Sequence, residues 1–113
     1  MNFQPQLAEK VMAGEKTVTR RLASTNPRSP WSYKHCGVQI GRTYAICPGR
    51  GKPQLGRVLI VSVRRELLGW LSYREARLEG FADADAFTDA WVAINGSYDE
   101  SALVWRIEFE VGT

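Results

Sequence analysis

The segment from Gly14 to Arg21 holds the side chains best suited to joint chemistry: the amine of Lys16, the hydroxyl of Thr19 and the guanidinium of Arg21. A threonine hydroxyl is a poor nucleophile until a neighbouring base takes its proton. Lys16 can be that base only if its pKa is lowered by burial or by nearby positive charge. Arg20 and Arg21 supply positive charge close by, so the segment predicts a nucleophile and its base.

This segment lies where a helix should end and a strand should begin. Pro5 suits a first helical turn, and Gly14 suits a helix terminator. Between them, one apolar stripe is formed by Leu7, Ala8, Val11 and Met12. From Thr17 to Leu22 the period changes to that of a strand. Alternation then places Thr17, Thr19 and Arg21 on one face and Val18 and Arg20 on the other. Lys16, in the turn, is long enough to reach over Thr19.

The spacing of Gly14, Lys16 and Arg21 resembles the G-x-K-x-x-x-x-R signature of the ASCH domain family. The resemblance covers nearly the whole chain and ends in the predicted strand Leu103–Val111. It implies one α+β domain over residues 1–113, a small PUA-like β-barrel with helices at its margins. Some members are similar to amidohydrolases that remove the acetyl group from N4-acetylcytidine, and others are described as RNA-binding or RNA-cleaving. The implied partner is therefore RNA or a modified nucleoside.

The resemblance also implies catalytic residues. In the hydrolytic members a Lys and a Thr lie in a G-x-K-[TS]-x-T pattern, which residues 14–19 match, so Lys16 and Thr19 are the implied pair. A Glu comes from the short helix before the second helical segment, and Glu79 fits that placement best. Glu75 is the competitor, although it also completes a capping box that begins at Ser72.

These residues allow a hydrolytic mechanism and a structural alternative. Glu79 could protonate the departing cytosine amine if a hydrophobic pocket keeps it protonated. Arg21 could orient Glu79 or bind the acyl oxyanion. Alternatively, Lys16, Arg21 and Glu79 form a structural ion-pair cluster that ties a helix to the barrel.

Charge is distributed unevenly along the chain, whose net charge is +3. Residues 16–65 contain no Asp or Glu, and ten of the twelve acidic residues lie from Glu66 onward. This basic window predicts a basic face and a polyanionic partner, with a merely solvated surface as the alternative. Its eleven basic residues are Lys16, Arg20, Arg21, Arg28, Lys34, Arg42, Arg50, Lys52, Arg57, Arg64 and Arg65.

Two loops carry further candidate substrate-binding residues beside Arg21. In the long connection 22–40, Trp31 and Tyr33 alternate with Arg28 and a lysine, a combination suited to stacking a base and holding phosphate. The alternative is that Trp31 packs the loop onto the core. The loop 47–53 is predicted to be a basic hairpin tip in which Arg50 and Lys52 contact a phosphate backbone.

Other classes of protein are less well supported. Cys36 and Cys47 are expected to be reduced thiols of a cytoplasmic protein, because no secretion signal or membrane span is recognisable. With His35 they lack zinc-ligand spacing, so neither a metal nor a cofactor is expected.

The predicted order of elements is helix, strand, long loop, two strands, two helices and a final strand with one buried face. This order fits a small α+β barrel or curled sheet, and the resemblance favours the PUA-like barrel. Two functions follow: a small hydrolase acting on a modified nucleoside or RNA, by amide hydrolysis or RNA cleavage, or a non-catalytic RNA-binding module.

Overall fold

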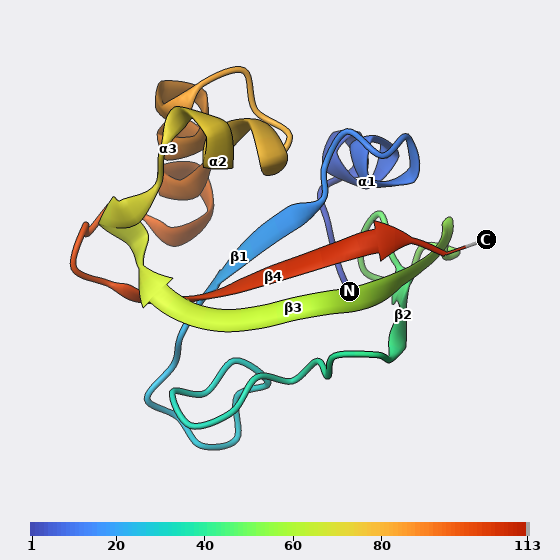
Figure 1. The fold of residues 1–113 in the computed structure, drawn as a ribbon, viewed down its shortest axis with the longest axis horizontal. Coiled ribbons are helices and arrows are strands. Elements are labelled where there is room, and N and C mark those ends of the chain that lie inside the picture. Colours follow the sequence, from blue (N-terminus) through green and yellow to red (C-terminus); the bar gives the residue numbers. More distant parts are fainter. Residues whose placement is uncertain (113) are drawn as a thin grey trace.

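The computed structural model describes residues 1–112 (Figure 1). Three α-helices, four strands and one short 3₁₀ helix, η1, follow one another in nearly the predicted order. Their bounds are α1 Pro5–Met12, β1 Val18–Leu22, β2 Thr43–Ile46, β3 Gly56–Leu67, η1 Leu68–Trp70, α2 Tyr73–Leu78, α3 Ala84–Asn95 and β4 Leu103–Val111.

The strands form one antiparallel sheet in the order β1-β4-β3-β2. The long strands β3 and β4 curve together at its centre, and β1 and β2 lie at its edges (Figure 1). The α+β class is as predicted, but the sheet is not closed into a barrel. The outer edge of β2 pairs instead with the first residues of the chain, since Phe3 N donates to Cys47 O and Cys47 N to Met1 O, both at 2.9 Å. The edges of β1 and β2 therefore do not meet.

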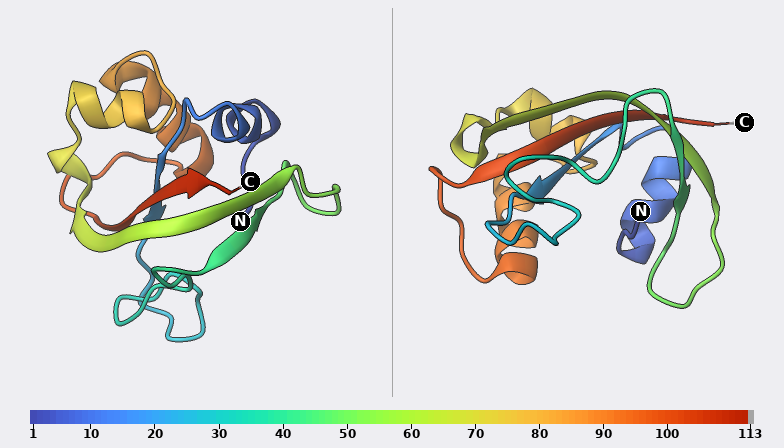
Figure 2. Two further views of the ribbon diagram at one scale, coloured as in Figure 1. Left: turned by 45° about the vertical axis from the view of Figure 1, so that its right-hand side comes forward. Right: turned by 90° about the horizontal axis from the view of Figure 1, so that it is seen from below.

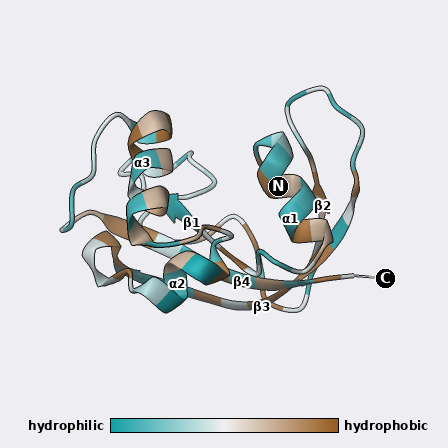
Figure 3. Cartoon of the chain, turned by 90° about the horizontal axis from the view of Figure 1, so that it is seen from above, coloured by the Kyte–Doolittle hydropathy of each residue, from teal (hydrophilic) through white to brown (hydrophobic). Residues whose placement is uncertain are grey.

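Each face of the sheet carries its own apolar core. On one face, Trp105, Ile107 and Phe109 of β4 pack with Phe3 and the buried side of α1. On the other, Val104 packs with residues of η1, α2 and α3. The prediction that β4 has only one buried face is therefore wrong. Figure 3 shows α1 and α3 on the two sides of β1, each with hydrophobic residues along its length.

The helix boundaries follow local signals. At the start of α2, the hydroxyl of Ser72 accepts a hydrogen bond from the amide of Glu75 at 3.1 Å. The carboxylate of Glu75 does not complete the expected capping box, because it binds two arginines instead. Gly14 and Gly80, which follow α1 and α2, have φ of +77° and +94°, in the left-handed region that suits glycine.

The long loop between β1 and β2 crosses one end of the sheet (Figure 2). The indole nitrogen of Trp105 donates to Ser32 O at 2.8 Å, and Arg65 donates to Tyr33 O at 2.9 Å. Trp31 is partly buried and packs against the core that includes Phe3. These contacts favour the alternative in which Trp31 fastens the loop to the core.

Candidate active site

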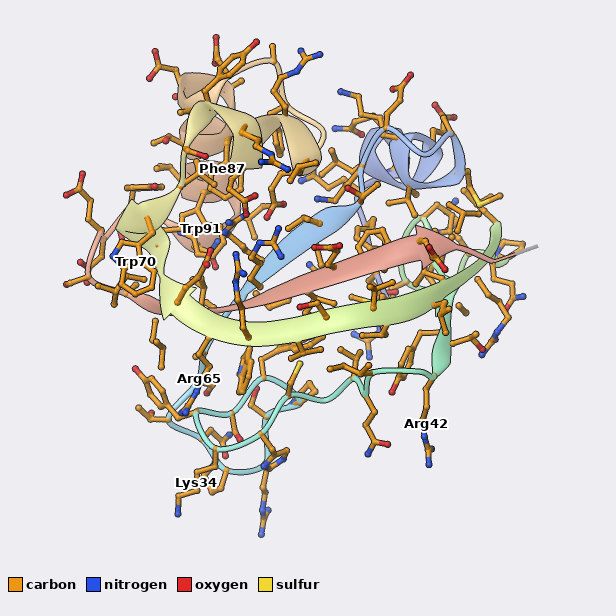
Figure 4. The ribbon with its side chains drawn as sticks, in the orientation of Figure 1. Lys34, Arg42, Arg65, Trp70, Phe87 and Trp91 are labelled. Carbon is orange, nitrogen blue, oxygen red and sulfur yellow. The ribbon has the colours of Figure 1, made fainter. Side chains whose placement is uncertain are left out.

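A cavity of about 450 Å³ lies at β1, between the first residues of the chain and α3. This volume is in the range of small-molecule sites. The apolar side of the cavity includes Phe3 from the N-terminal segment. It also includes Phe87 and Trp91 from α3, which are labelled in Figure 4. Its polar residues include Lys16, Thr19, Arg20, Arg21 and Glu79. All three residues predicted to be catalytic therefore line one cavity.

Lys16 is almost completely enclosed, with 2% of its surface exposed. Its ammonium group donates to Val18 O, to Glu79 O and to Glu79 Oε1, each at 2.8 Å. Burial lowers the pKa of Lys16 below its ordinary value of 10.5, and the positive charges of Arg21 and Arg20 lower it further, while Glu79 opposes the shift. Both influences that can lower the pKa of a lysine base, burial and nearby positive charge, are therefore present at Lys16.

Glu79 occupies the position directly after α2 and is followed by Gly80, whose φ is positive. Its Oε1 contacts the Lys16 ammonium, and its Oε2 accepts from Arg20 Nη1 at 2.9 Å. Glu75 points elsewhere and does not line this cavity. Of the two glutamates considered, Glu79 is the one at the cavity. The hydrophobic pocket that proton donation by Glu79 would require is not what surrounds it, since a cation contacts each of its carboxylate oxygens.

Thr19 is buried on β1 and lines the cavity. It lies opposite Ile107 of β4, on the same face of the strand as Arg21. The Thr19 hydroxyl is not among the three acceptors of Lys16. Lys16 must therefore lose a proton and redirect its nitrogen before it can activate Thr19.

Arg20 organises the charges beneath the site, a role that sequence analysis missed. Its guanidinium group donates to Glu66, at 2.7 and 3.1 Å, to Glu75 at 2.6 Å and to Glu79 at 2.9 Å. Glu75 also accepts from Arg106 Nε at 2.5 Å. Hydrogen bonds from Arg106, opposed by partial burial and reinforced by Arg20, lower the pKa of Glu75 to about 2. One feature of the sequence could have indicated these ion pairs: Arg106 is a charged residue within a mostly apolar strand.

Arg21 has a different environment from the one predicted. Its guanidinium lies over the rings of Phe3 and Trp31, 5.2 and 5.8 Å from their centroids, and donates to Asn2 O at 2.8 Å. It lines the cavity, whereas its Nε has no hydrogen-bond partner in the described part of the chain. Arg20, and not Arg21, forms the hydrogen bond that orients Glu79.

The other predicted binding residues lie outside the cavity. Arg28 and Tyr33 are exposed on the long loop, as are Arg50 and Lys52 on the loop between β2 and β3. The latter loop also contributes Pro48 and Gly49 to the cavity wall, so Arg50 follows the wall directly in sequence and Lys52 lies just beyond it.

The basic window does not fold into a purely basic face. Lys16 and Arg20 turn inward and pair with glutamates from the second half of the chain. Other members remain on the surface: Figure 4 shows Lys34 and Arg42 extending away from the side of the molecule that carries α2 and α3. The separation of charge in the sequence therefore produces an internal ion-pair cluster as well as surface cations.

Neither metal-type clusters nor membrane-spanning helices are evident in residues 1–112. These residues contain no group of three or more His, Cys, Asp or Glu side chains placed to hold a metal ion. No helix among them is both long and apolar enough to cross a bilayer.

The fold is a small α+β arrangement of the PUA-like kind that solved ASCH domains have. The chain is similar to the ASCH domain of Lactobacillus crispatus JV V101, with a TM-score of 0.66, 20% identity, and coverage of 94% of this chain and 70% of that one. It is also similar to a DUF984 protein from Enterococcus faecalis V583, with a TM-score of 0.64, 19% identity, and coverage of 94% and 69%.

A third similar structure is the hypothetical protein PH0355, with a TM-score of 0.57, 18% identity, and coverage of 99% of this chain and 96% of that one. No family model and no curated protein matches the sequence. At these identities the likeness establishes the fold, and the function has to be argued from the cavity.

Proposed function

We propose that this chain is an amidohydrolase that removes the acyl group from an N-acylated nucleoside of the N4-acetylcytidine type. The observation that carries the proposal is the meeting of Lys16, Thr19 and Glu79, from segments some sixty residues apart, at one cavity of nucleoside size. The apolar wall that includes Phe87 and Trp91 suits the base or the acyl group, and the proposal gives Arg21, which also lines the cavity, the role of binding a substrate oxygen.

The proposed reaction begins when neutral Lys16 accepts the proton of Thr19. The Thr19 oxygen then attacks the acyl carbon, and the carbonyl electron pair moves onto its oxygen. When this pair returns, the carbon–nitrogen bond breaks, and the Lys16 ammonium protonates the leaving amine. Water, with Lys16 again as base, attacks the acyl carbon of the threonyl ester, and the bond to the Thr19 oxygen breaks. The acyl group leaves as the carboxylic acid, and the proton that Lys16 took from water restores the Thr19 hydroxyl.

Glu79 has a different part in this mechanism from the one that the sequence suggested. Its Oε2 accepts a hydrogen bond from Arg20, and its Oε1 contacts the Lys16 ammonium. This carboxylate is therefore better placed to hold Lys16 than to donate a proton to the leaving group. Arg20 in turn fixes Glu79 through a charged hydrogen bond.

A second candidate, a non-catalytic RNA-binding module, is favoured by the hydrogen bonding of Lys16. All three ammonium protons have acceptors, as expected of a structural ion pair. Exposed cations such as Arg28, Arg50 and Lys52 would then contact phosphate.

The experiment that tests the proposal is incubation of the purified protein with N4-acetylcytidine, with chromatographic detection of cytidine. A parallel incubation with end-labelled RNA tests for cleavage and for binding. Release of cytidine that disappears in Thr19→Ala supports the amidohydrolase. RNA binding without any product from either substrate supports the binding module.

A further inference from the structure

The outer edge of β1 carries main-chain groups that the sheet does not use. In the β1–β4 pair, Phe109 N donates to Thr17 O and Ala23 N donates to Leu103 O. Antiparallel hydrogen bonding alternates, so the main chains of Thr19, Arg21 and Ala23 face β4, as does the carbonyl of Thr17, whose N–H donates to Leu78 O. The N–H and C=O groups of Val18, Arg20 and Leu22 consequently point outward from the sheet.

Part of this edge is already occupied. The carbonyl of Val18 accepts a hydrogen bond from the Lys16 ammonium, which confirms that the even-numbered residues face outward. No hydrogen bond within residues 1–112 engages the main-chain N–H or C=O of Arg20 on that side. Arg20 therefore presents one donor and one acceptor, side by side.

Around the main chain of Arg20, the cavity is lined by side chains from both faces of the sheet. Phe3 belongs to the core on one face of the sheet, and Phe87 and Trp91 belong to the core on the other, yet all three line the cavity. The cavity therefore wraps around the edge of β1. Arg20 also lines it, although its side chain is only 1% exposed and is bound to glutamates. What Arg20 can offer a ligand is its main chain.

We propose that the main-chain N–H and C=O of Arg20 bind the hydrogen-bonding edge of a pyrimidine base. The base extends the plane of the sheet, and its two faces contact the apolar side chains of the two layers. Adjacent acceptor and donor atoms, such as N3 and the exocyclic N–H of an N4-acylated or free cytosine, complement the Arg20 pair. The choice of a base as ligand rests on the proposed function.

An extended peptide could in principle pair with the same edge. A peptide strand, however, needs a continuous row of free main-chain groups. At Val18 the carbonyl is taken by Lys16, and the Lys16–Glu79 pair stands beside it. Only Arg20 and Leu22 remain, which suits a compact ligand better than a strand.

Amide hydrogen exchange, followed by NMR with cytidine as the probe, tests this inference. In the free protein the amides of Thr19 and Arg21, which face β4, should exchange at least about tenfold more slowly than that of Arg20. Saturating cytidine should slow the Arg20 amide by about fivefold, the effect of one hydrogen bond of about 1 kcal/mol. 3-Methylcytidine, whose edge is blocked, should give no such protection.

Several outcomes would overturn the inference: an Arg20 amide already protected in the free protein, cytidine that fails to bind up to its solubility limit, or bound cytidine that leaves Arg20 unprotected. Protection by an extended peptide but not by cytidine would overturn it as well. Hydrolysis of N4-acetylcytidine without protection of Arg20 would refute the inference alone. Protection of Arg20 by cytidine in a protein without hydrolytic activity would refute the proposed function alone.

Discussion

Arg20 and Arg106 lie directly opposite each other on β1 and β4, and one carboxylate oxygen of Glu75 accepts hydrogen bonds from both. Two like charges in a cross-strand pair would otherwise destabilise the sheet. Glu75, from α2, neutralises this repulsion and ties the helix to the strands. The same Arg20 guanidinium reaches Glu79 at the cavity, so the ion pairs that stabilise the fold also position the site.

Glu75→Gln should destabilise the protein by about 3 kcal/mol at neutral pH, because it leaves two largely buried arginines with a weaker partner. Urea unfolding measures this loss. Arg64→Gln is the matched control: Arg64 is 57% exposed in its pair with Glu66, so the cost should be below about 1 kcal/mol. Equal losses in the two variants would contradict the importance assigned to Glu75.

The same glutamate should shape the acid stability of the protein. The pKa of Glu75 is lowered from 4.5 to about 2, so its ion pairs stabilise the fold fully above pH 4.5, and this stabilisation is lost as the pH falls toward 2. Unfolding free energies measured between pH 5 and 2 should fall less steeply in Glu75→Gln than in the unmodified protein. Parallel pH profiles would count against this linkage.

The sequence predicted the local part of the site better than its long-range part. Lys16 and Thr19 belong to one short segment whose helix, turn and strand follow from Pro5, Gly14 and β-branched alternation. The place of Glu79 after α2 came from family resemblance. The contacts of Arg20 with Glu66 and Glu75 were not predictable, because they depend on which strands pair and on where α2 packs.

The prediction that the sheet closes into a barrel was wrong for a similar physical reason. The strands and their order along the chain were visible as alternation and turn residues. Whether the edges of the sheet meet depends on what else covers them, and residues 1–3 cover β2. Likewise, aromatic and basic residues in a loop favour both stacking on a ligand and packing on the core, and for Trp31 the core contact is the one observed.

Thr19→Ala should abolish release of cytidine from N4-acetylcytidine, because it removes the proposed nucleophile, while the unfolding transition changes little. Thr17→Ala is the control, since Thr17 lies two residues away on the same strand face but does not line the cavity. Retained turnover in Thr19→Ala would exclude the threonyl ester.

Turnover should rise with pH as Lys16 loses its proton, with a midpoint below 10.5 because burial lowers its pKa. Arg21 contributes a positive charge that lowers this pKa further, so Arg21→Gln should move the rising limb of the kcat profile to higher pH. The comparison uses saturating substrate, since Arg21 also lines the cavity. A rising limb that moves to lower pH in Arg21→Gln would contradict the proposed effect of Arg21 on the pKa of Lys16.

RNA binding, if present, should depend on the loop beside the cavity. Replacing both Arg50 and Lys52 by Gln should weaken RNA binding. It should also reduce the slope of affinity against salt concentration by the equivalent of about two phosphate contacts. Replacing Arg74 and Arg77 of α2 removes the same charge from another exposed site and provides the control. Equal effects of the two double variants would indicate non-specific attraction only.

The most direct test of the account is the rate at which Lys16→Arg releases cytidine from N4-acetylcytidine, measured beside the unmodified protein. The substitution keeps the positive charge but supplies a group that cannot act as a base at neutral pH. We expect cytidine release by the unmodified protein and a loss of at least about 100-fold in the variant, the usual range for a general base, with RNA affinity changed little. An unmodified protein that releases no cytidine, or a Lys16→Arg variant that releases it at the same rate, would contradict it.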